Sequence, residues 1–286
     1  MRGSQTIMVK QMTKPAFFMK NHLLTLILMV FLFDVSAQTV ITGKILEKDT
    51  SEPIPGVNIY LANSQIGTVS EVDGTFSLSV PVAGKVNLFF SHIGYKSTER
   101  TVYTTSDRPV NVLLEINETQ LTEVEVNAKS DKVWQRKLKR FRTQFLGNDK
   151  FAKYCKILNP WDIDFTENKG GFVAVSNQVL KIENKATGFL VNYYLRDFRI
   201  ESNITFYSGL ASFEPLEPES LEQYAEWEKN RREAYNGSLR HFLKSAQEEE
   251  LDEDGFEAHL VKLEKGDYAD QITDLSRNFE QRATKQ

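Results

Sequence analysis

The sequence predicts a mainly β chain with an α+β second half. We expect an N-terminal seven-stranded β-sandwich, then a mixed α+β domain with an antiparallel sheet and two or three helices. Apolar and polar side chains alternate with the period of half-buried strands in residues 57–61, 76–80 and 86–90. A glycine turn precedes each run, at Pro55-Gly56, Asp73-Gly74 and Ala83-Gly84. After residue 130 the apolar spacing becomes helical.

Five short motifs follow one another in the first half of the chain. They are Gly43-Lys44-Ile45, Pro53-Ile54-Pro55-Gly56-Val57, Gly67-Thr68, Asp73-Gly74-Thr75-Phe76 and Phe90-Ser91-His92-Ile93-Gly94-Tyr95. This order resembles the carboxypeptidase-regulatory-like domain, a family abundant in envelope proteins of Bacteroidetes. The resemblance implies an Ig- or transthyretin-like sandwich over residues 39–116. One departure is Ser70-Glu71, where the family more often has Thr-Asp; we expect a surface turn there.

Residues 1–37 have the pattern of a secretory signal peptide. Lys20 supplies a positive charge, residues 23–33 are an apolar run, and Val35-Ser36-Ala37 is a small-residue cleavage site. The run is shorter than the roughly 20 residues of a transmembrane helix. We therefore expect an exported protein, in the periplasm or at the outer membrane or cell surface, with no transmembrane segment after signal cleavage. Met19 is an alternative start of translation.

Charge and cysteine content exclude some function classes. Cleavage after residue 37 leaves 31 basic and 38 acidic residues, a formal net charge of about −7, so we expect no nucleic-acid partner. The lone Cys155 permits no internal disulfide in an exported chain. We interpret it as a partly buried structural thiol, because no activating neighbour is evident in the sequence.

The two predicted domains are joined by a short linker. Residues 110–116 form the last alternating strand of the sandwich, residues 117–129 the linker, and residues 130–286 an α+β domain of unknown function. A sandwich of this size is near the lower limit for independent stability, so we expect it to dock on the second domain.

A helix is predicted over residues 130–145. One face carries Trp134, Leu138, Phe141 and Phe145, at spacings of four, three and four, and the rest is basic. Two interpretations stay open. The basic face either binds an acidic partner or a membrane surface, or is only the solvated side of an amphipathic helix.

The rest of the second domain reads as an antiparallel sheet over residues 163–213, then helices beginning after Pro218 and at Ser238. Residues 159–160, 180–184, 187–189 and 193–195 resemble the uncharacterised C-terminal part of secreted Bacteroidetes proteins that begin with the regulatory-like domain. A further strand is expected at residues 255–260, after an acidic run at residues 248–254 that lacks the EF-hand pattern.

Residues 231–242 resemble the same proteins most clearly, with an arginine, then Ala-Tyr-x-Gly-Ser and His-Phe-Leu. The polar groups of this segment are the candidate binding residues Arg231, Tyr235, Ser238 and His241. In one interpretation Ser238 and His241 line a site and Arg231 holds an anion. In the other, Ser238 is a helix cap and His241 lies one helical turn away for structural reasons.

No enzyme motif is evident. A metallocarboxypeptidase needs His-x-x-Glu and a distant His, and none of the four histidines has glutamate at the third following position. We expect no catalytic residues, no metal and no cofactor.

The first hypothesis for function is a non-enzymatic envelope protein that binds or docks through its sandwich. Its partner would be an envelope protein such as an outer-membrane receptor, or a glycan. Trp161, Tyr193, Tyr194 and Trp227 could stack on sugars, but a place in the core fits them equally well. The alternative is a peptide or glycan hydrolase in the second domain that uses carboxylates such as Asp162, Asp164, Glu183 or Asp197.

Overall fold

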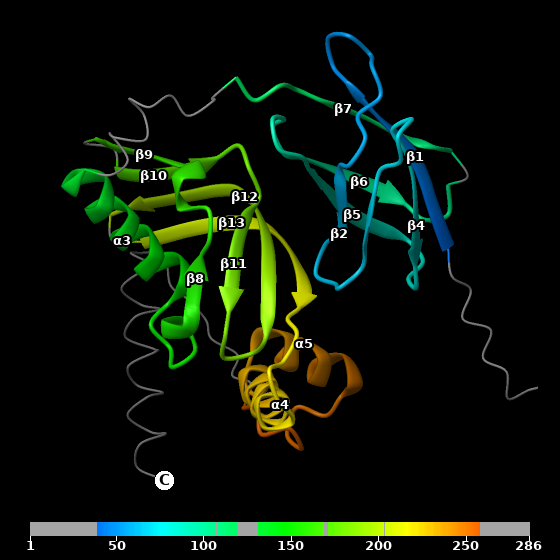
Figure 1. The fold of residues 1–286 in the computed structure, drawn as a ribbon. Helices are drawn as coiled ribbons and strands as arrows, with labels where there is room; N and C mark the ends of the chain where they lie inside the picture. Colours follow the sequence, from blue (N-terminus) through cyan, green and yellow to red (C-terminus); the bar gives the residue numbers. More distant parts are fainter. Residues whose placement is uncertain (1–38, 107, 119–130, 169–170, 203, 258–286) are drawn as a thin grey trace, which may run out of the picture. The chain divides into compact units, whose positions relative to one another are not determined.

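The computed structural model describes residues 39–106, 108–118, 131–168, 171–202 and 204–257. These residues divide into two compact units (Figure 1), the first comprising residues 39–185 and 189–216 and the second residues 186–188 and 217–257. The predicted signal peptide and most of the predicted linker lie outside the described residues, so both stay predictions.

The first half of the chain folds into two β-sheets. One has the order β4-β1-β7 and contains β1 (Thr39–Glu47), β4 (Thr75–Val80) and β7 (Val110–Leu114). The other has the order β3-β2-β5-β6 and contains β2 (Asn58–Leu61), β3 (Gly67–Val69), β5 (Lys85–Ser91) and β6 (Thr98–Tyr103). β1 pairs antiparallel with β4 and parallel with β7. The alternating apolar side chains meet between the sheets, where Ile45, Ile59 and Phe90 are fully buried.

Specific contacts explain the conformations of two loops of the sandwich, at Gly74 and at Ser70. Gly74 has φ +77°, and a Cβ there would lie 2.5 Å from the carbonyl oxygen of Ile45, so this turn requires glycine. The Ser70 hydroxyl donates to the carbonyl of Ile54 and accepts the N–H of Val57. The expected surface turn at Ser70 is therefore wrong, because Ser70 is buried. Serine keeps the hydroxyl group that threonine would supply.

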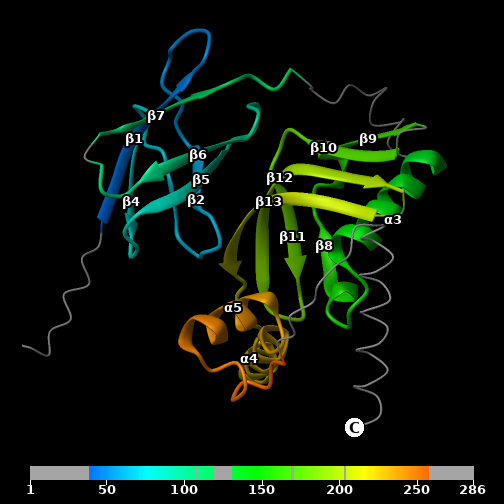
Figure 2. The ribbon, with the colours of Figure 1, turned by 180° about the vertical axis from the view of Figure 1, so that it is seen from behind.

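After the sandwich the chain forms a separate six-stranded sheet, which we call the second sheet. Its strands are β8 (Cys155–Ile157), β9 (Ile163–Asn168), β10 (Gly171–Ser176), β11 (Leu180–Asn184), β12 (Phe189–Glu201) and β13 (Ile204–Pro215). β12 and β13 form a long antiparallel hairpin, seen from both sides in Figures 1 and 2. The other edge of β12 pairs with β11 near its start and with β10 near its end. Short 3₁₀ helices at Ala152–Tyr154 and Pro160–Asp162 flank β8.

Helix α3 (Lys132–Leu146) packs on this sheet. It begins at Asp131, whose side chain accepts the N–H groups of Val133 and Trp134. Leu138 and Phe141 are buried against the sheet, and Trp134 and Phe145 pack beside them. The apolar face predicted from the sequence is therefore the face that covers the sheet.

The second unit contains α4 (Leu221–Tyr235) and α5 (Leu239–Glu248), capped by Ser220 and Ser238. Trp227 of α4 is buried against Gly188.

The observed elements confirm the predicted fold class, a seven-stranded sandwich followed by a sheet with helices. The strand expected at residues 255–260 is not found in its described part, because residues 255–257 form a turn and irregular backbone. Its remainder lies outside the described residues.

Candidate functional site

The candidate binding residue Arg231 lies on α4 and is directed at the main chain of its own unit. Its Nε donates to the carbonyl of Thr187 at 2.7 Å, and its Nη2 donates to the carbonyl of Gly188 at 3.3 Å. Its Nη1 pairs with Glu228 at 2.8 Å. The guanidinium thus uses three of its five N–H donors within the second unit and anchors α4 to residues 186–188, a structural role.

The other three predicted residues come together at the start of α5. The Ser238 hydroxyl oxygen accepts the N–H of His241 at 3.1 Å, so Ser238 is the helix cap that the sequence indicated. His241 Nδ1 accepts the N–H of Gly237 at 3.1 Å. The Tyr235 ring lies against the imidazole, with centroids 4.8 Å apart.

The structure adds three residues to this cluster. Asp254 Oδ2 lies 3.3 Å from His241 Nε2 and also accepts the hydroxyl of the buried Ser245. The Phe256 ring packs on the imidazole with centroids 4.8 Å apart. No local pattern indicates these contacts, because they depend on the path of the chain after α5 and Asp254 is one of several acids in the run.

This geometry favours a structural role for His241. One ring nitrogen accepts a backbone N–H and the other faces a carboxylate, so neither is directed at the Ser238 hydroxyl. A serine nucleophile would need the imidazole as its general base. The arrangement fastens the segment after α5 back onto the helix.

Three of the four carboxylates of the hydrolase hypothesis contact different partners. Asp162 accepts the side-chain amide of Asn159, and Glu183 lies 3.8 Å from Lys185. Asp197 pairs with Arg199, and Asp164 is exposed on β9. None of the four lines the pockets found along α3 or at the sandwich edge. The hydrolase hypothesis gains no support from the geometry.

Cys155 is half-buried at the start of β8, near the carbonyl of Phe151. Burial, followed by the nearby Asp149 charge, raises the pKa of its thiol. Within the described residues, no group of three or more His, Cys, Asp or Glu could hold a metal ion.

We expect Cys155 to react with iodoacetamide more slowly than a free cysteine at neutral pH. A raised pKa leaves a smaller thiolate fraction, so the rate should level off at a higher pH in the folded chain than in the unfolded chain. Labelling followed by mass spectrometry across a range of pH measures the rate, with the urea-unfolded chain as control. Equal rates in the folded and unfolded chain would contradict the assignment.

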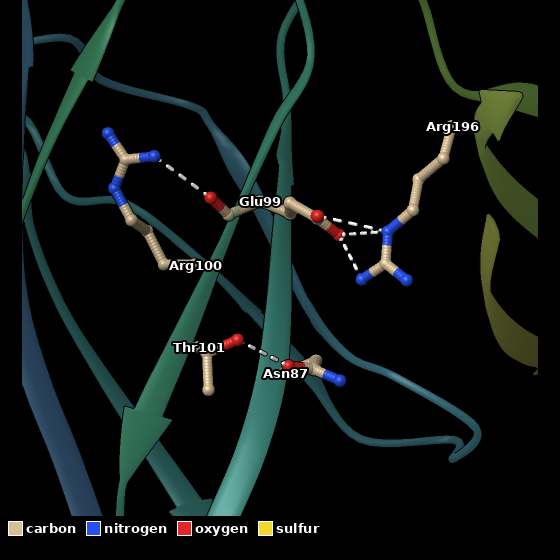
Figure 3. A network of polar contacts seen from close by, with 5 residues as sticks. All are labelled: Asn87, Glu99, Arg100, Thr101 and Arg196. Carbon is tan, nitrogen blue, oxygen red and sulfur yellow. Dashed lines mark hydrogen bonds and ion pairs between the residues drawn. The ribbon is translucent and has the colours of Figure 1, made fainter.

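Polar contacts join the sandwich to the second sheet within the first unit. The Glu99 carboxylate of β6 accepts Arg196 Nε at 2.8 and 2.9 Å and Arg196 Nη2 at 2.6 Å (Figure 3). Beside this pair, the Thr101 hydroxyl donates to Asn87 within the sandwich. The Gln178 side chain donates to the carbonyl of Tyr95 at 2.7 Å.

Apolar contacts lie in the same junction. Tyr60 and Phe89 of the sandwich stack with centroids 4.8 Å apart, and Phe89 lies 6.4 Å from Tyr194 of β12. Leu210 of β13 and Val179 complete the buried cluster. Burial raises the pKa of Tyr60, and the neighbouring Glu214 carboxylate adds to the shift. One face of the sandwich thus packs on the second sheet. The small size of the sandwich led us to expect this docking.

Comparison with known families identifies the sandwich. Residues 41–126 match the family described as CarboxypepD_reg-like domain. We refer to this matched segment as the CarboxypepD_reg-like domain. The match agrees with the resemblance in the sequence motifs, and it covers the seven strands of the sandwich except the first residues of β1.

Curated relatives of this chain include three receptors. TonB-dependent receptor P39 of Formosa agariphila is 39% identical over 66 residues, which are 23% of this chain and 6% of that protein. TonB-dependent receptor P3 of the same organism is 24% identical, over 38% of this chain and 10% of the receptor. TonB-dependent receptor SusC of Bacteroides thetaiotaomicron is 33% identical, over 40% of this chain and 11% of the receptor.

The matched segments span about a tenth or less of the length of each receptor. Among solved structures, a cohesin–X-dockerin complex from Acetivibrio cellulolyticus covers 27% of this chain and 58% of the matched chain. Its sequence identity is 20% and its TM-score of 0.24 is too low to support an argument.

The CarboxypepD_reg-like domain has a groove at the edge between its sheets. The groove has a volume of about 540 Å³ and is lined by residues 39–42 of β1 and by Val102, Tyr103, Arg108 and their neighbours. β7 pairs with β1 only from Gly43 onward. Over residues 39–42, the β1 edge on the β7 side therefore has no strand partner among the described residues.

Aromatic side chains considered for glycan stacking differ in exposure. Trp227 is 5% exposed and belongs to the core of the second unit, so it is not available for stacking. Tyr193 and Tyr194 are half-buried, and burial raises the pKa of Tyr193 to about 12. Trp161 is 49% exposed.

No helix within the described ranges is long and apolar enough to cross a membrane.

Proposed function

We propose that this chain is an exported, non-enzymatic envelope protein whose CarboxypepD_reg-like domain docks on an outer-membrane receptor. The observation that carries the proposal is the match of residues 41–126 to this domain, together with the similarity to TonB-dependent receptors. The role of His241 and Arg231 in holding the second unit together supports a binding function over catalysis.

The groove of the domain supplies a site for such docking. An open strand edge presents unpaired backbone N–H and C=O groups, and an extended segment of a partner can add to it as a further strand. Residues 39–42 present such an edge, with Tyr103 and Arg108 exposed beside it. A different part of the domain, around Tyr60 and Phe89, is occupied by the junction with the second sheet. We therefore assign the partner to the groove.

The test is a pull-down of the tagged mature chain from gently solubilised envelopes after cross-linking. We expect a TonB-dependent receptor as a stoichiometric partner, identified by mass spectrometry. The variant Tyr103→Ala with Arg108→Glu should reduce its recovery at least tenfold, the usual effect of losing more than about 1.4 kcal/mol at an interface.

The matched control is Tyr224→Ala with Arg232→Glu, which changes an exposed tyrosine and an exposed arginine of the second unit in the same way. It should recover the receptor as well as the unchanged chain does. Recovery of no receptor, or equal loss in both variants, would show that the groove is not the docking site.

A further inference from the structure

The solvent-exposed arc of α3 is densely cationic. Leu138 and Phe141 mark its buried side. The remaining arc carries six basic side chains and no acid; we call these six the cationic surface: Lys132, Arg136, Lys137, Lys139, Arg140 and Arg142. In the whole stretch 131–156 there are nine basic and two acidic residues, a formal charge of +7 in a chain of net −4.

The two acids of this stretch bind backbone amides. Asp131 caps α3, and Asp149 accepts the N–H groups of Phe151 and Ala152. Within the cationic surface, Arg140 pairs with Glu167 at 2.6 Å, and the other five have no ion pair with a described residue.

Helix stability does not account for this arrangement. Lys132 and Arg136 are four residues apart, as are Arg136 and Arg140, and like charges at this spacing repel and destabilise a helix. Basic residues favour a helix when they lie in its last turn, but the last turn of α3 has none. The repulsion is retained in the fold and would be relieved by an external polyanion.

Hollows lie on both sides of the cationic surface. One, with a volume of about 290 Å³, is lined by Lys139, Arg142 and Lys153 and also by Asp149. The other, of about 210 Å³, is lined by Arg136, Lys137 and Arg140 with Glu167. Each hollow brings three cations and one carboxylate together, an excess of positive charge that suits a phosphate group.

Exposed aromatic and apolar side chains lie in the segments that follow α3. Tyr154 and Trp161 are each 49% exposed, and Leu158 is 36% exposed. The Lys153 ammonium lies 5.0 Å from the centre of the Tyr154 ring, so this ring borders a cation of the larger hollow. Tyrosine and tryptophan beside lysine and arginine are typical of groups that lie at a membrane–water interface.

We propose that the cationic surface of α3 binds an anionic phospholipid surface, with lipid phosphates in the two hollows. A cluster of four to eight basic residues is the usual feature of proteins attracted to anionic lipids. The exposed Tyr154 and Trp161 favour a lipid surface over an acidic protein, because they suit the headgroup region. This proposal is independent of docking through the groove, which lies on the CarboxypepD_reg-like domain.

The test is flotation of the purified mature chain with lipid vesicles. We expect binding to vesicles of phosphatidylcholine mixed with phosphatidylglycerol, no binding to phosphatidylcholine alone, and release by salt. Each basic residue near such a surface contributes roughly a fivefold factor in partitioning. The variant Arg136→Glu, Lys139→Glu, Arg142→Glu should therefore reduce binding on the order of 100-fold.

The control variant reverses three exposed cations elsewhere, Lys85→Glu, Lys229→Glu and Arg232→Glu, with the same change in net charge. It should bind vesicles as the unchanged chain does. The melting temperature of the α3 variant should not fall. Arg136→Glu makes the repulsive pairs with Lys132 and Arg140 attractive, and the pairs 136–139 and 139–142 are like-charged in both chains. An unchanged melting temperature would show that the α3 variant is folded, so a loss of vesicle binding could not be explained by a loss of structure.

Several outcomes would overturn the proposal. These are no binding of the unchanged chain to anionic vesicles, or equal loss in the α3 and control variants. Titration with inorganic phosphate alone distinguishes a site for soluble phosphate, and titration with polyglutamate distinguishes a site for an acidic protein. Saturable binding of either without vesicle binding would replace the lipid assignment. No receptor is present in this test, so its failure is distinguishable from failure of the docking function.

Discussion

Phe141→Ala is expected to lower the free energy of unfolding of the first unit by about 3–5 kcal/mol, the usual cost of truncating a buried phenylalanine. The side chain is fully buried between α3 and the sheet. Its ring lies 4.7 Å from that of Phe198 and 5.0 Å from that of Phe145. The alanine would leave a cavity in the middle of this aromatic cluster. Amide hydrogen exchange of peptides from β10 and β12 in mild denaturant measures the loss.

The matched control is Val133→Ala, on the same helix but 50% exposed. It should change stability by less than about 0.5 kcal/mol, as exposed substitutions usually do. A similar small change for Phe141→Ala would contradict the packing of α3 on the sheet. Hydrogen exchange is preferred to a global melting curve, because a chain with two units need not unfold in one step.

The sequence predicted elements well wherever apolar spacing was regular. The helix α3 follows from the spacing of Trp134, Leu138, Phe141 and Phe145, and all four side chains pack inward. In β4 burial alternates along the strand as the sequence pattern does. In β2 and β5 the alternation predicts the strand but not the burial, because Tyr60 and Phe89 on the other face are also buried, in the cluster with Val179 and Leu210.

Strands with few inward apolar residues escaped prediction. In β6 only Val102 is buried, and Glu99 and Arg100 at its centre are polar. Pairing with β5 rather than its own alternation holds β6 in the sheet. In β1 a buried glycine, Gly43, interrupts the inward series between Ile41 and Ile45. Such strands are determined by backbone pairing with distant segments, which the local pattern does not show.

The candidate site shows the same limit. The cap formed by Ser238 was predictable, because it is a local contact with the next turn of α5. The bonds from Arg231 reach carbonyl groups more than forty residues earlier in the chain. The pairing of His241 with Asp254 depends on a turn after α5. The residues were thus identified as notable, but their partners required the fold.

Gly188→Ala is expected to disrupt the second unit. A Cβ at this position would lie 2.1 Å from Trp227 Cε3, and the backbone has φ +68°, a conformation that favours glycine. The indole is buried and held by the helix, so it cannot move aside freely. Overpacking of this kind costs about 1–3 kcal/mol or more, and left-handed strain adds about 1–2 kcal/mol. Faster hydrogen exchange of α4 and a shift of the Trp227 fluorescence to longer wavelength measure the effect.

The change Gly237→Ala separates the two contributions. Gly237 has a similar φ of +74°, but nothing lies within 4 Å of a Cβ built there. It should therefore show the backbone strain alone, about 1–2 kcal/mol, while Gly188→Ala shows the strain and the collision with the indole. If the two variants lost the same stability, Trp227 would not be packed on Gly188. The anchoring of α4 by Arg231, whose bonds end on Thr187 and Gly188, would then be in error as well.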